Sequence, residues 1–215
     1  MKSVLLIGLG RFGKNVAEKL NELGHEVMAI DKVEKRVNAV LPIVTDAQIG
    51  DSKNEAFLKT LGVDNYDVCI VTIGDDFQSS LETTSLLKDL GAKRVVSRAS
   101  DDIHEKFLLK NGADNVVYPE KQLASFVAIK YTTNHILDFI ALDSEYAVYE
   151  ISVPEEWYQK SVGELDVRKK YNLNILALRD ENKQSIIVNS ETVFSPSQTV
   201  LVLGKWKDIK KCFKD

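Results

Sequence analysis

The sequence contains few of the residues that build disulfide-stabilised or metal-dependent proteins. Its 215 residues include only two cysteines and three histidines. Cys69 and Cys212 stand far apart, with neither a CxxC pattern nor another metal-ligand spacing, which argues against a disulfide framework and against a cysteine zinc site. Because Cys69 lies in an apolar run, we expect it to be a small buried hydrophobic residue.

Long apolar segments and an excess of positive charge are also missing. No apolar run approaches the roughly 18 residues that a membrane-spanning helix needs. A strand pattern has already started by Val4, so no signal peptide is expected, and we predict a cytoplasmic protein. The net charge is −4 and no segment concentrates lysine and arginine, so no nucleic-acid partner is expected. The run KWKDIKKCFK near the C-terminus alternates with apolar residues and predicts an amphipathic helix.

Short apolar runs alternate with helical patterns through the first two-thirds of the chain. The patterns predict strands at 4–10, 25–31, 42–50, 67–74, 93–100 and 115–119. Helical patterns lie between them, at about 12–23, from 32 onward, and at about 53–61, 81–91 and 103–112. Gly62 and Gly112 stand where a left-handed residue would end a helix before the next strand. This βαβαβ alternation predicts an α/β Rossmann fold with a doubly wound parallel sheet.

The pattern changes in the last third of the chain. A long helix is expected from Glu120 to about Asp138, with an apolar face broader than one sheet edge requires. Further β runs follow at 146–153, 174–179, 185–189 and 199–204, with a short helix at 162–171. We therefore predict a Rossmann domain at 1–119, a crossover helix and linker at 120–144, and a small α+β domain at 145–215.

The stretch GLGRFGKN, residues 8–15, fits two nucleotide-binding patterns. A P-loop needs Ser or Thr where Asn15 stands, so that a hydroxyl can bind Mg²⁺. A Rossmann turn needs a strand before three glycines, a helix after them, and an acid about 20 residues on to hold the ribose. Gly8, Gly10 and Gly13 meet these conditions, with Asp31 as the acid. The sequence therefore favours the Rossmann turn, and Asp31 disfavours the 2′-phosphate of NADP.

Arg11 stands inside this turn, where two bridging phosphates need no extra cation. It either faces additional negative charge, such as the terminal phosphate of ATP or a ligand of a neighbouring subunit, or simply faces solvent. The histidines are scattered, and neither Tyr-x-x-x-Lys nor G-x-S-x-G occurs. These observations favour a ligand-sensing domain without catalysis. A small NAD(H)-dependent oxidoreductase and an NADH-responsive redox sensor are the alternatives.

Several motifs together resemble one family. GLGRFG, the aspartate after EVMAI, VTIGDD, VSRAS and YPEK look like the RCK (regulator of potassium conductance) family, specifically the TrkA- and Ktr-type cytosolic regulatory subunits of bacterial potassium uptake systems. The resemblance covers nearly the whole chain. It implies ATP or ADP as ligand, with NAD(H) in some members. It also implies a homodimer that assembles into an octameric ring, peripheral to the inner face of the cell membrane, beneath a potassium-translocating membrane subunit that the bound nucleotide gates.

The resemblance also implies roles for individual positions. The nucleotide-binding residues would be Gly8, Gly10, Arg11, Phe12, Gly13, Asp31, Lys32, Asp51, Ser52, Ile73, Gly74, Asp75, Arg98 and His104. Arg11 would contact the γ-phosphate held by the adjacent subunit, and Glu120 would help bind a divalent cation, Mg²⁺ or Ca²⁺, at the dimer interface. In the second domain, a dimerisation domain in this family, Arg168, Asn174 and Ile175 match the region where some relatives bind cyclic di-AMP. A histidine that some of these relatives carry nearby is absent, and Ile175 as a core residue with a solvated Arg168 stays an equal alternative.

Overall fold

A computed structural model describes residues 1–143, 145–182 and 184–213 of the chain. The chain forms two compact units, Met1–Lys121 and Gln122–Asp215. The predicted linker end at residue 144 and the predicted domain end at residue 215 lie outside the described residues. Among the helices that the structure describes, none is long and apolar enough to cross a membrane.

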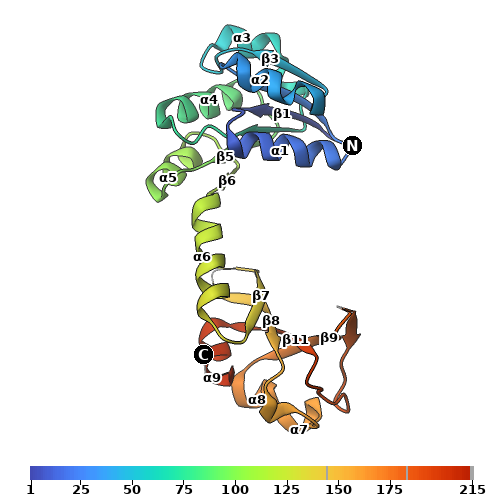
Figure 1. Cartoon of the computed structure of the whole chain (residues 1–215). Coiled ribbons are helices and arrows are strands. Elements are labelled where there is room, and N and C mark those ends of the chain that lie inside the picture. The colour runs from blue at the N-terminus through green and yellow to red at the C-terminus, as the bar shows by residue number, and fades with distance from the viewer. Residues whose placement is uncertain (144, 183, 214–215) are drawn as a thin grey trace. The chain divides into compact units, whose positions relative to one another are not determined.

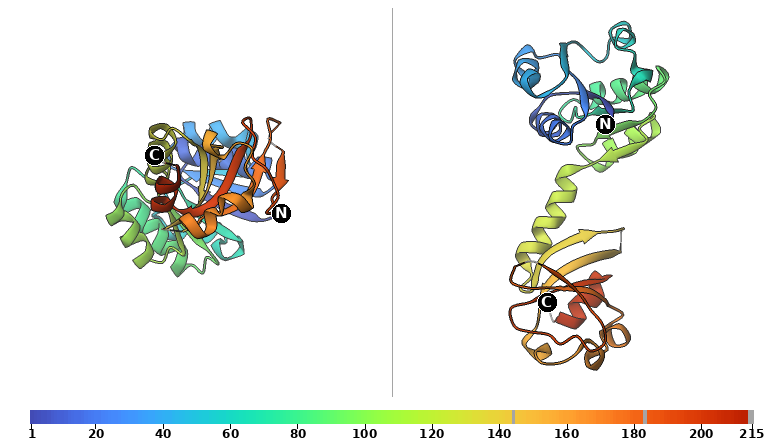
Figure 2. Two further views of the ribbon diagram at one scale, coloured as in Figure 1. Left: turned by 90° about the horizontal axis from the view of Figure 1, so that it is seen from below. Right: turned by 90° about the vertical axis from the view of Figure 1, so that its right-hand side faces the viewer.

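The first unit is built on a six-stranded parallel sheet (Figures 1 and 2). Its strands are β1 (Ser3–Ile7), β2 (Glu26–Asp31), β3 (Asp46–Ile49), β4 (Val68–Val71), β5 (Val95–Arg98) and β6 (Asn115–Val117). They are arranged in the order β3-β2-β1-β4-β5-β6, with every pairing parallel. This confirms the doubly wound sheet. The strand order reverses between β1 and β4, and in such folds a ligand crevice opens at the carboxyl ends of these strands.

Helices cover both faces of this sheet, which explains its continuous apolar strands. They are α1 (Arg11–Glu22), α2 (Glu34–Val40), α3 (Glu55–Thr60), α4 (Phe77–Asp89) and α5 (Asp102–Lys110), with 3₁₀ turns at Leu41–Ile43 and Val63–Asn65. Val4 and Leu6 of β1 pack in one core with apolar residues of α1 and α2. Leu5 and Ile7 pack in a second core with residues of α3 and α4. Alternate side chains of one strand therefore enter opposite cores, as a sheet covered on both faces requires.

Two predicted helix ends are confirmed. Gly62 follows α3 with φ of 63°, and Gly112 follows α5 with φ of 103°, so both occupy the left-handed conformation expected of them.

The long helix predicted from Glu120 to Asp138 is wrong in its last six residues. Helix α6 (Pro119–Thr132) ends six residues earlier than predicted, and Ile136–Ala141 forms strand β7. This strand pairs with β8 (Tyr146–Ser152), and the ring of Phe139 stacks between those of Phe126 and Tyr149. Pairing with a strand later in the chain thus overrides a local pattern that also suits a helix.

The second unit is α+β, as predicted, with an antiparallel sheet in the order β10-β9-β11-β8-β7. The remaining elements are β9 (Asn174–Arg179), β10 (Ser185–Ile187), β11 (Thr199–Lys205), a 3₁₀ turn at Glu155–Trp157, α7 (Val162–Leu165), α8 (Val167–Tyr171) and α9 (Trp206–Phe213). The single helix predicted at 162–171 is divided because Asp166 adopts a left-handed conformation, with φ of 44°. Helix α9 is the predicted amphipathic helix, and it buries Ile209 and Phe213.

Candidate functional site

A cavity of about 490 Å³ opens in the first unit where β1, β2, β4 and β5 end. The structure brings together here nearly all of the residues predicted for the nucleotide. These are Gly8, Gly10, Arg11, Phe12, Asp31, Lys32, Asp51, Ser52, Ile73, Gly74, Asp75 and Arg98. Glu120, which was predicted for the divalent cation, lines the same cavity. Gly13 and His104 do not line the cavity. The cavity therefore lies where the reversal of strand order places the ligand crevice of a Rossmann sheet.

The glycine turn is held in shape by contacts with Gly13 of α1 and with Thr72. A Cβ added at Gly13 would lie 1.9 Å from the carbonyl oxygen of Gly8, so only glycine permits this contact between helix and turn. The Thr72 hydroxyl donates to the same carbonyl and lines the cavity. Gly13 thus shapes the site without facing it. Thr72 was missed by the sequence reasoning, because it reaches the turn from the end of β4, far along the chain.

The start of α1 presents positive charge to the cavity. Its N-cap, Gly10, has no side chain to satisfy the first N–H groups, and the first turn contains no acid. Arg11, the first helical residue, is exposed and lines the cavity, and no ion pair of its guanidinium occurs within the described residues. Lys14, which a P-loop would aim at phosphate, instead pairs with Glu18 at 3.7 Å outside the cavity. The arrangement suits an anion bound at a helix N-terminus.

Asp31 is anchored at the end of β2. It is buried, and its two oxygens accept the N–H groups of Leu9 at 2.7 Å and Val33 at 2.9 Å. Nη1 of Arg36 lies 3.4 Å from the same carboxylate and also lines the cavity, a position that the sequence patterns did not indicate. Because each carboxylate oxygen has two lone pairs and these three donors use three of the four, Asp31 can still accept one ribose hydroxyl on Oδ1.

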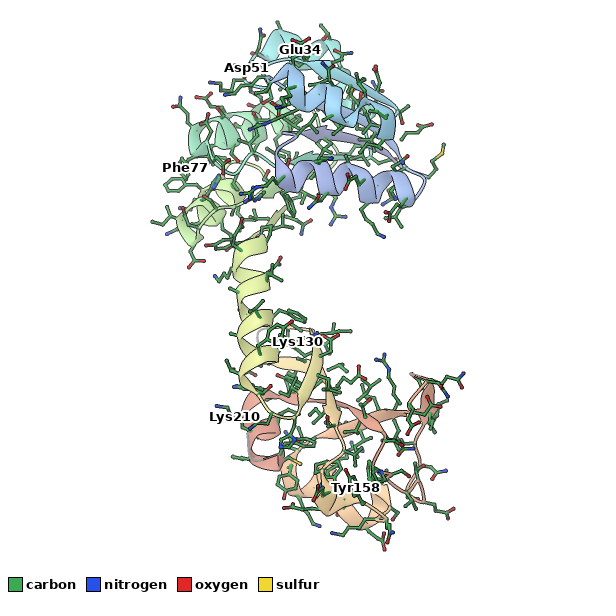
Figure 3. The ribbon with its side chains drawn as sticks, in the orientation of Figure 1. Glu34, Asp51, Phe77, Lys130, Tyr158 and Lys210 are labelled. Carbon is green, nitrogen blue, oxygen red and sulfur yellow. The ribbon has the colours of Figure 1, made fainter. Side chains whose placement is uncertain are left out.

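Another part of the cavity lining combines acids with hydroxyls that serve the fold. Asp51 is exposed at the end of β3 (Figure 3), and its carboxylate accepts the N–H of Lys53 at 3.0 Å. The buried Ser52 hydroxyl forms a hydrogen bond with Thr83 Oγ1 at 2.7 Å, so its role in the structure is to join the end of β3 to α4. Asp76, another lining residue that the sequence did not single out, caps α4 by accepting the N–H of Ser79 at 2.9 Å. Hydrogen bonds from the Ser79 hydroxyl and backbone lower the pKa of the Asp76 carboxyl, so it stays charged.

Arg98 and Glu120 form an ion pair in the lining of the cavity, beside Phe12. The guanidinium of Arg98 donates to Oε1 of Glu120 and lies over the ring of Phe12, 5.4 Å from its centre. A Cβ on Gly74 would come within 2.6 Å of Nη1, so glycine at this position makes room for the guanidinium. No group of three or more potential ligands among histidine, cysteine, aspartate and glutamate gathers anywhere in the described parts of the chain.

His104 was predicted among the nucleotide-binding residues, but the structure places it outside the cavity. Its side chain is fully buried, with Nδ1 3.1 Å from the Ser100 hydroxyl and its ring 4.8 Å from that of Phe77, which Figure 3 shows at the start of α4. Burial lowers its pKa, so the imidazole is neutral at pH 7. His104 therefore packs the interface of α4 and α5 instead of lining the cavity.

A second, smaller cavity of about 320 Å³ lies in the second unit. Arg168, Asn174 and Ile175, the residues predicted there, all line it, together with residues of α7 and Ser190. Ile175 also packs against the core, and Arg168 is exposed. The structure therefore brings the three predicted residues together at one cavity.

Comparisons with known proteins agree with this two-unit organisation. The TrkA-N domain model matches residues 4–119, and the TrkA-C domain model matches residues 148–214. Ktr system potassium uptake protein C of Bacillus subtilis is 38% identical over 98% of this chain and 95% of that protein, and protein A of the same organism is 35% identical over the same shares.

Solved structures support the fold. The RCK domain of GsuK superposes with a TM-score of 0.68 at 16% identity over 97% of this chain, and the GsuK channel bound to NAD with a TM-score of 0.69 at 17% identity over 96%. This chain spans 46% and 38% of those two longer chains.

Proposed function

The chain belongs to the TrkA family of RCK-domain potassium uptake proteins, and on this basis we propose that it is a nucleotide-sensing regulatory subunit. It would gate a potassium-translocating membrane protein according to whether ATP or ADP is bound. It would act by binding alone, without catalysis.

The observation that carries this proposal is the unpaired cation at the glycine turn. The free N–H groups at the start of α1 suit phosphates in general, whereas Arg11 adds a full positive charge that is not neutralised within the described residues. A ligand shifts a two-state protein only by its differential affinity for the two states. ATP and ADP differ by one phosphate, and Arg11 is the group best placed to sense that difference.

The assembly and its location are part of the proposal. The names of the two Bacillus relatives place them in a potassium uptake system. We propose that this chain likewise forms homodimers that assemble into an octameric ring, on the cytoplasmic side of the membrane and held there by the transporter. The exposure of Arg11 suits contact with a nucleotide of the adjacent subunit, as the family resemblance implies.

The residues of one chain do not by themselves fit a divalent cation. Glu120 is the single carboxylate assigned to it, and it is paired with the cationic Arg98. Mg²⁺ and Ca²⁺ need several oxygen ligands, so phosphate oxygens would have to supply the others. Cyclic di-AMP is the corresponding proposal for the cavity of the second unit.

NAD(H) is the competing ligand, and with it an oxidoreductase or a redox sensor. The anchored Asp31 suits the ribose of either nucleotide, and one structural relative is described as bound to NAD. No histidine, tyrosine or cysteine lines the cavity in the part of the chain that the structure describes, so these usual proton donors of hydride transfer are not at hand. This favours the sensor over the enzyme.

The test is a melting-temperature series with ATP, ADP, NADH and NADPH, each with and without Mg²⁺ or Ca²⁺, because a ligand of the native state raises the melting temperature by mass action. We expect ATP to stabilise the protein more than ADP. The variant Arg11→Ala should lose this difference while keeping most of the binding. Lys14→Ala, which removes an exposed cation of the same helix outside the cavity, is the control and should keep the difference.

Stabilisation by NADH alone would contradict the adenine-nucleotide switch. Equal loss of ATP and ADP affinity in Arg11→Ala would contradict the role of this residue. Cyclic di-AMP, added in the same series, tests the second cavity.

A further inference from the structure

Arg98 is held by several contacts where it lines the cavity. Its side chain is 17% exposed, lies over the Phe12 ring and fits beside Gly74. Its charge is balanced by one carboxylate, that of Glu120, whose side chain is 57% exposed. The cation is thus fixed by the fold, whereas its anion stands at the surface.

The guanidinium also has unused capacity for hydrogen bonds. It carries five N–H donors, and its buried Nε has no partner among the described residues. An unsatisfied buried donor is unfavourable, and a charged one more so. Because Arg98 lines the cavity together with the start of α1, a phosphate bound at the glycine turn would lie within the field of the same guanidinium.

We propose that the Glu120 carboxylate occupies the position beside Arg98 that a nucleotide phosphate would take. The carboxylate and the phosphate then compete for the same guanidinium. When a phosphorylated ligand binds, Arg98 exchanges its ion pair with Glu120 for a charge-assisted hydrogen bond to phosphate, and the Glu120 carboxylate is released from the guanidinium. This inference rests on the proposed nucleotide site. Glu120 would then set ligand specificity, because its carboxylate weakens the binding of phosphorylated ligands and leaves the affinity for the nucleoside unchanged.

The size of the effect follows from the exposure of the carboxylate. Ion pairs with an exposed partner stabilise proteins by about 0.2–1 kcal/mol, so loss of the competitor should strengthen phosphate binding by at most about fivefold. The effect should grow with the charge of the ligand. It should be absent for adenosine, small for ADP and largest for ATP.

The chain offers a matched control for the charge that is removed. Asp102, in the first turn of α5, pairs with Lys121 at 2.5 Å, and it does not line the cavity. The variants Glu120→Gln and Asp102→Asn each remove one negative charge from the same unit by a nearly isosteric change. Only the first should free Arg98.

Isothermal titration of the full chain with ATP, ADP and adenosine, in a chelator so that no divalent cation bridges carboxylate and phosphate, tests the inference. We expect Glu120→Gln to bind ATP about three to five times more tightly than the unmodified protein, with unchanged adenosine affinity, and Asp102→Asn to match the unmodified protein. Arg98→Gln should bind ATP more weakly, and adding Glu120→Gln to it should have no further effect, because the competition acts through Arg98.

Each other result is decisive. Unchanged or weaker ATP binding by Glu120→Gln would overturn the inference while leaving the nucleotide site intact. An equal gain for adenosine would show a general change of the cavity and would also overturn it. If the unmodified protein binds neither ATP nor ADP, the proposed function itself fails.

Discussion

Replacing Gly13 or Gly10 of the same turn by alanine should have different effects. Gly13→Ala should lower the stability of the first unit, whereas Gly10→Ala should weaken nucleotide binding. At Gly13 the new methyl group would lie 1.9 Å from the Gly8 carbonyl oxygen and 2.6 Å from Thr72 Oγ1. That carbonyl cannot withdraw without losing its hydrogen bond from Thr72, so helix and turn must separate. At Gly10 the methyl group meets no protein atom within 4 Å, and φ of −64° suits any residue.

The magnitudes follow from these contacts. Overpacking costs about 3 kcal/mol at the upper end of its usual range. Alanine regains about 1 kcal/mol in helix propensity, because Gly13 lies within α1. The free energy of unfolding of the first unit should therefore fall by about 2 kcal/mol, and its melting temperature by roughly 6–10 °C. Gly10→Ala should cost less than about 1 kcal/mol, the difference between glycine and alanine as N-cap.

Binding should show the opposite order. The methyl of Gly10→Ala stands on the cavity wall, where the backbone must approach phosphate, so we expect ATP affinity to fall at least about tenfold. Circular dichroism melting follows stability, and the transition that nucleotide shifts is the one assigned to the first unit, since two units need not melt together. A Gly13→Ala protein that melts within about 1 °C of the unmodified one would refute the packing argument. A Gly10→Ala protein with full ATP affinity would refute the placement of phosphate.

Two further predictions concern buried titratable groups. Burial lowers the pKa of His104 from its ordinary value of 6.5, so the unfolded chain binds a proton that the folded chain excludes, and the free energy of unfolding should fall as the pH drops through 6.5. Urea titrations at pH 5 to 8 should show this slope, and His104→Gln should flatten it; an unchanged slope would contradict the assignment. Burial raises the pKa of Cys69 to about 12, so a thiol reagent at pH 8 should label Cys69 only on unfolding, at a rate that follows the opening of the sheet. Rapid labelling of Cys69 in Cys212→Ser under native conditions would contradict its burial.

The sequence was most informative where a structural feature depends on residues that stand close together in the chain. The turn, its helix and Asp31 could be predicted because three glycines and one acid must stand at fixed distances for their backbone to meet phosphate and ribose. Strand β7 could not be predicted, because 136–141 becomes a strand only by pairing with β8. The hydrophobic pattern alone does not separate the two outcomes in so short a run.

The missed site residues differ in how far they stand from their partners. Thr72 reaches the turn through its hydrogen bond to the Gly8 carbonyl, a contact across 64 residues that no spacing in the sequence encodes. Arg36 and Asp76 contact residues near them in the chain, Asp31 and the start of α4, but only the folded sheet brings both to the cavity. His104 shows the converse, since its place in the motif suggested a ligand contact whereas burial against Phe77 removes it from the cavity.

The small binding energy available at one nucleotide site gives a physical reason for the proposed octameric assembly. Moving a two-state equilibrium from 1:99 to 99:1 needs a differential binding energy of about 5.5 kcal/mol. The exchange of one ion pair with an exposed partner supplies at most about 1 kcal/mol, so Arg98 and Glu120 in one subunit cannot drive a complete switch. Eight subunits that change together, as in the proposed octameric ring, would add their contributions and exceed this requirement even at about 0.8 kcal/mol each. The expected consequence is a cooperative response to ATP that disappears in any variant reduced to dimers, although each site still binds the nucleotide.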